Sequence, residues 1–364
     1  MHTPGNADTS SRQIRCRFEA SFRMSQARVA IIGVGRMGMR HASVVGDLGL
    51  SLEAVSDILP DALSAAGTKL GLGADRQYTD PFRLIDEVRP EVLIVSTTAP
   101  THRDLVVHAA RSGVRAVLCE KPAATSIAAC DAMIEACLDS GTRLAINHQM
   151  RFMEQYQKPR DLVNSPAYGG LGSVIVSAGN FGMAMNGTHY FEMFRYLTDE
   201  APVSVNAWFS PEALPNPRGP QFIDAAGSVR MTTASGKRFY LDCSPDQGHG
   251  MFVTYNCRNG RIDIDELSGQ MTMTVRDQEH RDQPTTRYGM PYSVTVAAIT
   301  PADAVAPTRS VLEALLAGAN YPTGEDGRLA MQALVAAHIS NKRGGSTVRL
   351  DDPEIASYGD LPIA

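Results

Sequence analysis

The stretch RVAIIGVGRMG, at Arg28–Gly38, decides the fold. Its opening run RVAII is short and rich in Val and Ile, which is typical of a buried β-strand. Gly33, Gly35 and Gly38 then form the pattern G-x-G-x-x-G, and a helical segment runs on from His41 to Leu48. In this strand–turn–helix context the first glycine permits a tight turn, the second lets backbone approach a pyrophosphate, and the third allows close helix–strand packing. The pattern predicts a dinucleotide-binding turn.

A helix N-terminus supplies free amides and a partial positive charge, both of which suit phosphate groups. We therefore expect the residues of this turn to bind the cofactor: Gly33, Gly35, Arg36, Met37 and Gly38. A glycine-rich turn without a ligand is the structural alternative.

An acidic residue stands at the end of the next apolar run. Asp57 follows Gly38 by 19 residues, where its carboxylate can accept hydrogen bonds from ribose hydroxyls. Its charge would repel the 2′-phosphate of NADP, and no Arg follows it immediately. We expect NAD as the cofactor, with NADP as the alternative. Asp57 could instead cap the helix that begins at Pro60, although Asp61 could supply that cap.

The chain divides into two sequence patterns. From Arg28 to about Asn147, short Val- and Ile-rich runs alternate with amphipathic segments at 60–70, 81–88, 101–112 and 126–140. Apolar strands separated by amphipathic helices predict a doubly wound parallel sheet. After about Met150, helical segments lie near 152–164 and 189–197, and helices near 309–316 and 325–341 close the chain. Alternating runs that predict strands lie at 172–181, 203–209, 227–243 and 259–266, and the third of these contains a hairpin turn at Ser235-Gly236. Alternating runs are typical of an antiparallel sheet with one exposed face.

We therefore predict an α/β protein of two domains. Residues 24–148 would form a Rossmann domain that binds NAD, and residues 149–364 an α+β domain with a large, open, mostly antiparallel sheet for substrate binding and oligomerisation. Residues 1–23 are polar and lack the apolar segment of a signal peptide. We expect them to be either a disordered arm or an extension from an upstream start.

Composition excludes several classes of function. The 364 residues carry 34 Lys and Arg against 39 Asp and Glu, for a net charge of −5, and no basic stripe suggests a nucleic-acid partner. No apolar run approaches the length of about 18 residues that indicates a membrane span. The six cysteines are scattered without a CxxC pair, which predicts reduced thiols in a cytoplasmic protein and no metal site.

Further motifs lie at predicted strand ends. They are STTAPTH at Ser96–His102, LCEKP at Leu118–Pro122, NHQMRF at Asn147–Phe152 and GTH at Gly187–His189. Together with the glycine turn, these motifs resemble the Gfo/Idh/MocA family, which includes glucose–fructose oxidoreductase, inositol dehydrogenase and rhizopine-catabolism proteins. The resemblance extends from about Met24 to about Leu350. It implies a Rossmann domain, a sheet-based substrate domain, and hydride transfer in the cleft between them.

The resemblance assigns the catalytic roles to Lys121 and His189. Lys121 matches the active-site lysine of the family, and Pro122 the proline that often follows a cis bond. Removal of a hydroxyl proton suits a lysine whose pKa is lowered by burial. His189 could hydrogen-bond the reacting hydroxyl or relay its proton to solvent. A histidine at a helix start with a structural hydrogen bond is the alternative for His189.

The resemblance also suggests the remaining contacts. On the cofactor side these are Thr97, Thr98, Pro100, His102, Glu120 and Lys121. On the substrate side they are Lys121, Arg151, Asn186, His189 and Tyr190. Arg151 could instead order the cleft, Tyr190 could lie in the core, and His102 could be a helix-start residue.

One position departs from the family pattern. Many members carry Asp four residues before the catalytic histidine, whereas this chain has Met185. Asn186 and Glu192 are nearby substitutes, and Glu192 could reach His189 from the next helical turn. The departure leaves the proton relay and the substrate preference open.

The implied function is an NAD(P)-dependent oxidoreductase that interconverts a secondary alcohol and a ketone on a polyol, sugar or sugar derivative. Two alternatives remain: an NAD-dependent glycosidase that oxidises its sugar transiently, and a non-catalytic NAD-binding regulator. We expect a small-molecule partner, and a homodimer or homotetramer formed through the open sheet. Loops at Pro211–Pro220 and Arg287–Tyr292 would set specificity.

Overall fold

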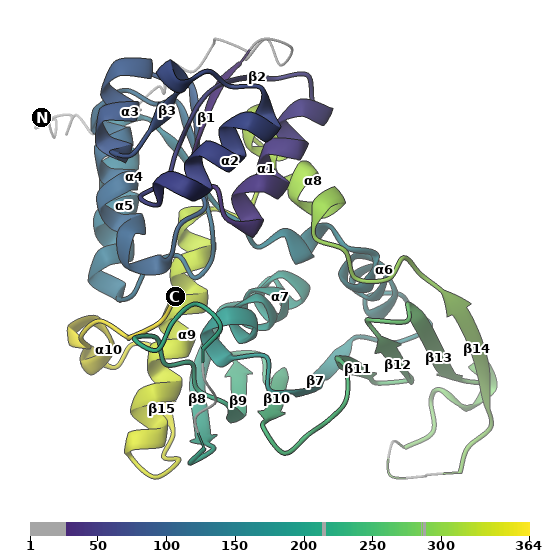
Figure 1. The fold of residues 1–364 in the computed structure, drawn as a ribbon. Helices are drawn as coiled ribbons and strands as arrows, with labels where there is room; N and C mark the ends of the chain where they lie inside the picture. Colours follow the sequence, from purple (N-terminus) through teal and green to yellow (C-terminus); the bar gives the residue numbers. More distant parts are fainter. Residues whose placement is uncertain (1–26, 213–215, 285, 287–288) are drawn as a thin grey trace, which may run out of the picture.

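The computed structural model describes residues 27–212, 216–284, 286 and 289–364. The predicted extension at residues 1–23 lies outside these described residues, as do parts of both predicted specificity loops. Two sheets dominate the fold, one in each half of the chain (Figure 1).

The first sheet is parallel throughout and has the strand order β3-β2-β1-β4-β5-β6. Its strands are β1 (Arg28–Ile32), β2 (Ser51–Ser56), β3 (Gln77–Tyr78), β4 (Val92–Val95), β5 (Ala116–Cys119) and β6 (Arg143–Ile146). This is the Rossmann order, and it confirms the predicted doubly wound sheet. The order reverses between β1 and β4, so a crevice opens there at the carboxyl ends of the strands. Only the two-residue edge strand β3 had no sequence signal.

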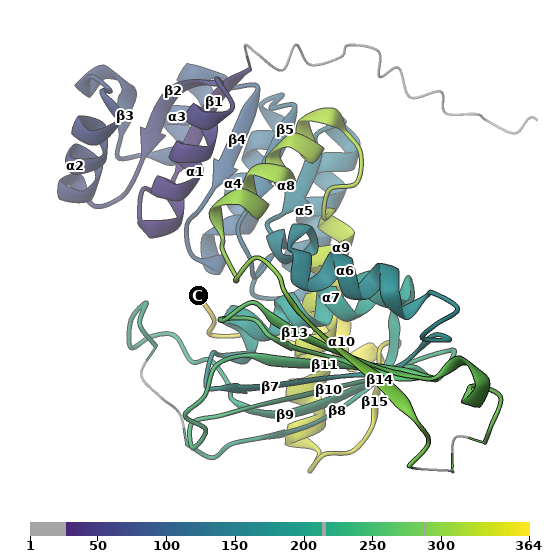
Figure 2. The same cartoon turned by 90° about the vertical axis from the view of Figure 1, so that its right-hand side faces the viewer.

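Helices cover both faces of this sheet (Figure 2). One face carries α1 (Arg36–Asp47), α2 (Pro60–Leu70) and α8 (Val305–Ala317), and the other carries α3 (Pro81–Val88), α4 (His102–Arg111) and α5 (Ile127–Ser140). Because both faces are covered, every residue of β4 and β5 is buried, and this explains why their sequences are apolar without alternation.

The second sheet has nine strands in the order β14-β13-β12-β11-β7-β10-β9-β8-β15. They are β7 (Leu171–Gly179), β8 (Pro202–Phe209), β9 (Gly227–Thr233), β10 (Arg238–Ser244), β11 (Phe252–Cys257), β12 (Gly260–Asp265), β13 (Gln270–Arg276), β14 (Tyr292–Ala298) and β15 (Val348–Arg349). All neighbours are antiparallel except β7 and β10. The sequence predicted β7 to β10 and β12, but it gave no assignment for β11, β13, β14 and β15.

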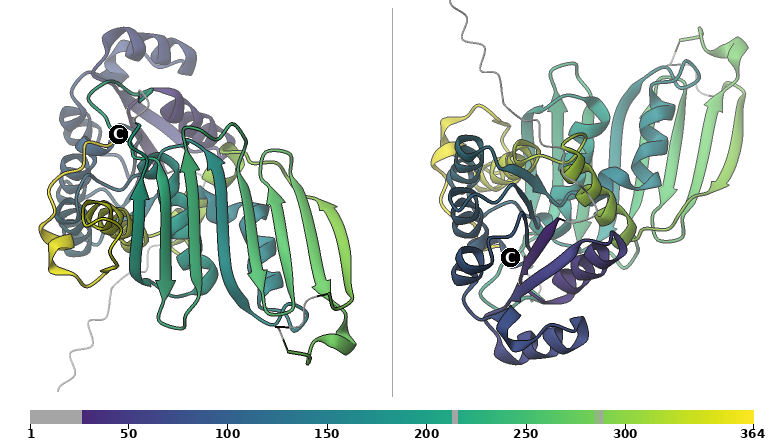
Figure 3. Two further views of the ribbon diagram at one scale, coloured as in Figure 1. Left: turned by 90° about the horizontal axis from the view of Figure 1, so that it is seen from below. Right: turned by 90° about the horizontal axis from the view of Figure 1, so that it is seen from above.

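Helices cover only one face of the second sheet. They are α6 (Glu154–Val163), α7 (Thr188–Thr198) and α9 (Gly324–Lys342), while the view from below shows the opposite face bare (Figure 3). The predicted alternation follows from this arrangement, and β9 alternates between buried and half-exposed residues along its length. A short helix, α10 (Pro353–Ser357), follows β15. Among the described residues, no helix is both long and apolar enough to cross a bilayer.

The last two long helices tie the domains together. Val311, Leu312 and Leu315 of α8 are buried in the core of the first sheet. At the start of α9, Thr323 forms a bridge with Ala145 of β6. The predicted division after residue 148 therefore marks the change of sheet, but α8 packs spatially with the first domain, because its apolar face covers that sheet.

A buried carboxyl pins two helices to the second sheet. Glu266 follows β12 and accepts hydrogen bonds from the hydroxyl groups of Tyr156 (2.7 Å) on α6 and Tyr190 (2.8 Å) on α7. Burial raises the pKa of Glu266 to about 7, although the two tyrosine hydroxyls oppose the shift. The folded protein therefore holds the proton of this group more tightly than the unfolded chain does.

This raised pKa predicts a pH-dependent stability. The contribution of Glu266 is complete below its usual pKa of 4.5 and is lost as pH rises through about 7. The difference between these two pKa values corresponds to roughly 3 kcal/mol in the free energy of unfolding. Glu266→Gln, which cannot ionise, should lose less stability than the wild type between pH 5 and pH 8, as measured by urea midpoints. The exposed Glu279→Gln is the control and should follow the wild type; parallel curves for all three proteins would contradict the assignment.

Candidate active site

The glycine turn lies at the crevice of the first sheet and has the shape that a dinucleotide requires. Gly33 has φ +88°, and a Cβ there would lie 2.8 Å from the backbone of Ser96. A Cβ on Gly38 would lie 1.9 Å from the carbonyl oxygen of Gly33, whereas one on Gly35 would meet nothing within 4 Å. Gly35 therefore leaves open space above the first turn of α1, where the amides have no intrahelical partner. The residues present fit a pyrophosphate.

Asp57 lies beside this turn, half-buried at the carboxyl end of β2. One carboxylate oxygen accepts from the amide of Val34 (2.9 Å) and the other from the amide of Leu59 (3.0 Å). A carboxylate has about four acceptor positions, so two remain for ribose hydroxyls. Asp57 therefore orders the glycine turn and the loop after β2 at once.

The segment after β4 forms the opposite wall of the crevice. The hydroxyl of Ser96 donates to the carbonyl of Gly33 (2.7 Å), and this contact joins the segment to the glycine turn. Thr97 and Thr98 are half-buried and lie just before the short helical turn η3 (Ala99–Thr101). Pro100 lies within this turn and is exposed. These three predicted cofactor residues lie at the same sheet edge as the glycine turn.

His102 is fully buried, and its ring joins this segment to the next loop. Its Nδ1 faces the carbonyl oxygens of Pro122 (3.1 Å) and Ala123 (3.2 Å), and its Nε2 faces that of Thr97 (3.2 Å). Both ring nitrogens are thus occupied by protein, which contradicts a direct contact between this ring and a cofactor. His102 fixes the loop that carries Lys121.

Glu120 is a buried support of the site. One oxygen is 2.8 Å from Nε2 of His41 on α1 and accepts from the side-chain amide of Asn147 (2.8 Å). Burial opposes its charge, yet these bonds and the Lys121 cation lower its pKa to about 2. Protein groups thus hold one oxygen of the carboxylate, and the direct cofactor contact of Glu120 stays a prediction.

Lys121 lies at the carboxyl end of β5, and a cis peptide bond joins it to Pro122, as the resemblance implied. Its Nζ donates to the carbonyl oxygen of Met185 in the second domain. Burial lowers the pKa of Lys121 to about 8. Glu120 and Asp224 oppose this shift, whereas Arg218 and Arg36 add to it. A lysine in this setting can bind and release a proton near neutral pH.

His189 lies in the first turn of α7, close to Lys121, and is buried. Its Nδ1 is 3.3 Å from Nδ1 of His148, and the two rings meet edge to face with centroids 5.3 Å apart. Burial, together with the cation of Lys121 and with His148, holds the pKa of His189 well below its usual value. The imidazole is therefore neutral at physiological pH. The predicted catalytic pair, Lys121 and His189, does come together.

Two residues near Lys121 were not predicted as site residues. Asp224 accepts from the amides of Ala184 (2.7 Å) and Met185 (2.9 Å), which places its carboxylate beside the position where Met185 departs from the family pattern. Arg218 is half-buried and acts electrostatically on Lys121. Arg218 lies within the predicted specificity loop at 211–220 and Asp224 follows it, and the prediction that this loop influences specificity was the sequence signal for both.

The predicted substitute Glu192 does not reach His189. Its carboxylate pairs with Arg151 and with Arg195 (3.2 Å), because these two cations flank it. Arg151 also binds Asp326 on α9 (2.8 Å), so its guanidinium orders the cleft, which was the alternative for this residue. Its Nε has no partner among the described residues, and the substrate contact of Arg151 stays a prediction. Of the two nearby substitutes, Glu192 is therefore held by arginines and does not pair with His189.

Two further predicted substrate residues have protein partners. Tyr190 is fully buried, and its hydroxyl donates to Glu266 (2.8 Å). This contradicts a substrate role and places Tyr190 in the core. Asn186 is half-buried, and its amide donates to the carbonyl of Phe181 (2.6 Å), while its side-chain oxygen remains a possible acceptor.

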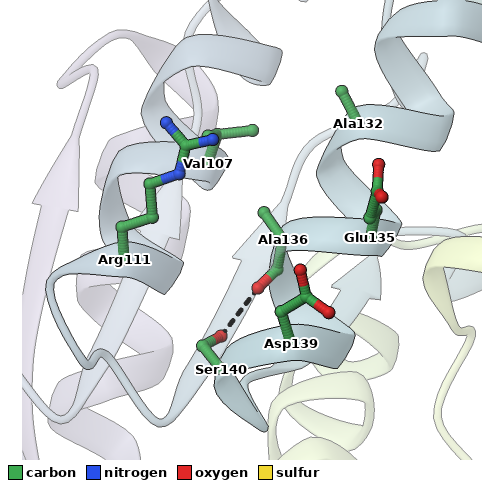
Figure 4. A pocket seen from close by; sticks show the side chains of 7 residues that line it. All are labelled: Val107, Arg111, Ala132, Glu135, Ala136, Asp139 and Ser140. Atoms are coloured by element: carbon green, nitrogen blue, oxygen red, sulfur yellow. Dashed lines mark hydrogen bonds between the residues drawn. The ribbon is translucent and has the colours of Figure 1, made fainter.

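A groove elsewhere on the first domain contains none of these residues. It lies between α4 and α5 and is lined by Val107, Arg111, Ala132, Glu135, Ala136, Asp139 and Ser140 (Figure 4). Its one drawn hydrogen bond joins the Ser140 hydroxyl to the carbonyl of Ala136 within α5 (2.8 Å). The groove offers none of the proton-transfer groups that surround Lys121.

Comparison with known proteins is consistent with this geometry. Residues 27–148 match the model of an oxidoreductase family with an NAD-binding Rossmann fold. Myo-inositol 2-dehydrogenase of Thermotoga maritima is 30% identical over 191 residues, or 48% of this chain and 55% of the relative, so the alignment spans about half of that protein. D-apiose dehydrogenase of Paraburkholderia graminis is 26% identical over 89% of this chain and 90% of its own length.

Solved structures share the whole architecture. An oxidoreductase from Agrobacterium radiobacter, in complex with NAD+, L-tartaric acid and magnesium, has a TM-score of 0.75 at 18% identity and covers 89% of this chain and 98% of its own. Scyllo-inositol dehydrogenase from Lactobacillus casei, with NAD(H) and scyllo-inositol, has a TM-score of 0.68 at 16% identity and covers 89% and 99%. Identities this low establish the fold alone. A model of the Gfo/Idh/MocA family of oxidoreductases thus matches the first domain, and D-apiose dehydrogenase is similar to the chain across both domains.

Proposed function

We propose that this protein is an NAD-dependent dehydrogenase that interconverts a secondary alcohol and a ketone on a polyol, sugar or sugar derivative. NADP is the alternative cofactor. The observation that carries the proposal is the setting of Lys121. It combines a lowered pKa with a position between the glycine turn of the first domain and His189 of the second.

Oxidation of an alcohol removes a hydride from the carbinol carbon and a proton from the hydroxyl group. When bound, NAD supplies the acceptor for the hydride of the carbinol carbon. The hydroxyl proton needs a base, and Lys121 in its neutral form can take it at a pH near 8. In the reverse direction the Lys121 ammonium returns the proton to the developing alkoxide.

The cofactor would lie along the crevice of the first sheet. Gly35 and the first amides of α1 would hold the pyrophosphate, and Asp57 the ribose hydroxyls. Thr97, Thr98 and Pro100 line the other side. A carboxylate at Asp57 favours NAD, because a 2′-phosphate there would bring two negative groups together.

The substrate class follows from the relatives and calls for a direct screen. Myo-inositol, scyllo-inositol, D-apiose, other aldoses and sugar acids should be offered with NAD and with NADP, while the absorbance of the reduced nicotinamide is followed. We expect turnover with at least one polyol or sugar. Binding of NAD without turnover of any would contradict the proposal and favour a regulator, and release of sugar from a glycoside without net NADH would favour a glycosidase.

Lys121→Gln should reduce turnover by at least 100-fold, because the base is lost while the side chain keeps much of its length. NAD affinity, measured by calorimetry, should change little. In the wild type, kcat/KM for oxidation should rise with pH through about 8, as Lys121 loses its proton. The exposed Lys69→Gln is the matched control and should retain activity. Substantial turnover by Lys121→Gln would remove Lys121 from the mechanism.

Asp57→Asn should shift the cofactor preference toward NADP. The asparagine side chain keeps one of the two oxygens that accept from the loop amides, and it removes the charge that would repel a 2′-phosphate. We expect the ratio of NAD to NADP affinity to fall roughly tenfold, an electrostatic effect of about 1.4 kcal/mol. Asp61→Asn, an exposed neighbour in the first turn of α2, changes the net charge equally and should leave the ratio alone. An unaltered ratio in Asp57→Asn would refute the ribose role.

The proposal extends to assembly and location. Ile175, Phe252, Val294 and Val296 are among the large apolar side chains exposed on the bare face of the second sheet, and such a surface favours a homodimer or homotetramer. The five described cysteines are free thiols, which suits the reducing cytoplasm.

Ile175→Glu should dissociate such an assembly. Ile175 lies on the central strand β7 and is 42% exposed, so a charge there would be buried unpaired in an interface formed by this face. The molar mass from light scattering should fall to that of the monomer. Leu138→Glu, on an exposed helix of the first domain, is the control. If Ile175→Glu keeps the wild-type mass, the interface lies elsewhere.

A further inference from the structure

His189 lacks the acidic partner that its family position leads one to expect. Met185 stands where many members have Asp, and Glu192 is held by Arg151 and Arg195. Within the described part of the chain, the hydrogen-bond partner of the His189 ring is Nδ1 of His148, at 3.3 Å. His148 follows β6 in the first domain, so this contact crosses the cleft.

The contact joins two nitrogens of the same kind, so the protons must be distributed unequally. If both rings are neutral, one Nδ1 carries a hydrogen and the other accepts it. Facing His148 are Lys121 and Glu120 from the loop after β5, Arg151 from the turn after β6, and Asp326 from α9; facing His189 are Lys121 and His148. Burial is the largest influence on both rings, and with the adjacent cations it keeps both neutral.

The second nitrogen of each ring decides which one donates. Nε2 of His148 is buried without a partner among the described residues. A buried N–H without an acceptor is rare in proteins, so this nitrogen more readily carries a bare lone pair. The hydrogen of His148 then sits on Nδ1 and is donated to Nδ1 of His189. The hydrogen of His189 is thereby left on Nε2.

Nε2 of His189 differs from Nε2 of His148 in its access to the cleft. It makes no hydrogen bond within the described residues, yet it is not one of their side-chain atoms that are both fully buried and without a partner. It is therefore the ring nitrogen left for a ligand in the cleft, beside Lys121. An N–H there can donate to an oxygen but cannot accept a proton.

We propose that His148 is a positioning residue that holds His189 as the Nε2–H tautomer, so that His189 donates a hydrogen bond to the reacting oxygen while Lys121 alone exchanges the proton. The inference rests on the proposed dehydrogenase function. In the oxidation, the hydroxyl proton passes to the neutral amine of Lys121, the carbinol carbon loses a hydride to NAD, and the new carbonyl oxygen keeps the hydrogen bond from His189. The substrate thus loses one proton and one hydride, which balances the reaction.

The tautomers can be measured without turnover. Protein labelled with 15N in its histidines would be studied by long-range proton–nitrogen NMR at pH 7, without cofactor, with signals assigned through His148 and His189 variants. We expect His189 as the Nε2–H tautomer and His148 as the Nδ1–H tautomer. His148→Leu should shift the nitrogen signals of His189 toward a mixture, whereas His148→Asn, whose amide can donate from a similar place, should largely retain them. A wild-type His189 protonated on Nδ1 would overturn the proposal.

Kinetics with the best polyol from the screen, or with myo-inositol as the first probe, give a second readout. His148→Leu should lower kcat on the order of tenfold, with little change in KM and with the pH inflection of Lys121 still near 8. His148→Asn should recover most of the loss. His338→Asn changes a largely buried histidine on α9 and is the control, expected to behave as wild type. A His148→Leu enzyme with unchanged kcat would also overturn the proposal.

The two proposals fail differently. If no alcohol is oxidised but the tautomers are as expected, the dehydrogenase function fails while the arrangement of the two rings stands. If oxidation is normal and His189 keeps its signals in His148→Leu, the positioning role fails. Should His148→Leu not fold, the wild-type tautomers and His148→Asn still decide the question.

Discussion

The site depends on one buried carboxylate. Glu120 accepts a hydrogen bond from the side-chain amide of Asn147 and lies against Nε2 of His41, each at 2.8 Å. These contacts join helix α1, the end of β5 and the end of β6. A buried charge is tolerated only when it is paired and hydrogen-bonded. These bonds therefore fix the strand ends relative to each other, and they fix Lys121, the next residue, at the crevice where the cofactor would lie.

The pKa of Lys121 is set by opposing electrostatic influences from both domains. Burial and the cations Arg218 and Arg36 favour the neutral amine, while Glu120 and Asp224 favour the ammonium. Asp224 and Arg218 belong to the second domain, so the proton affinity of Lys121 is set only when the domains are packed together. Because α8 and α9 of the later chain pack on the first sheet, that packing is part of the fold.

Much of the first domain was predictable, because strands buried on both faces and helices with one apolar stripe leave strong periodic signals. The glycine turn and Lys121 were found from motifs in that context. The second sheet was predicted less completely. The outer strand β14 was not assigned, although Tyr292, Val294 and Val296 alternate with polar residues. The strand is exposed along nearly its whole length, so these apolar side chains do not pack into the core.

The sequence by itself determined the Rossmann domain and the NAD cofactor class, and it singled out Lys121 and His189 as the predicted catalytic pair, since local motifs at strand ends carry that information. Only the tertiary structure decided which groups face each other. In the folded chain Glu192 pairs with Arg151, and the Tyr190 hydroxyl donates to Glu266. Asp224 accepts from the amides of Ala184 and Met185, and the ring of His148 contacts that of His189. Residues 39 or more positions apart meet through packing and charge pairing, and these long-range contacts leave no local pattern in the chain.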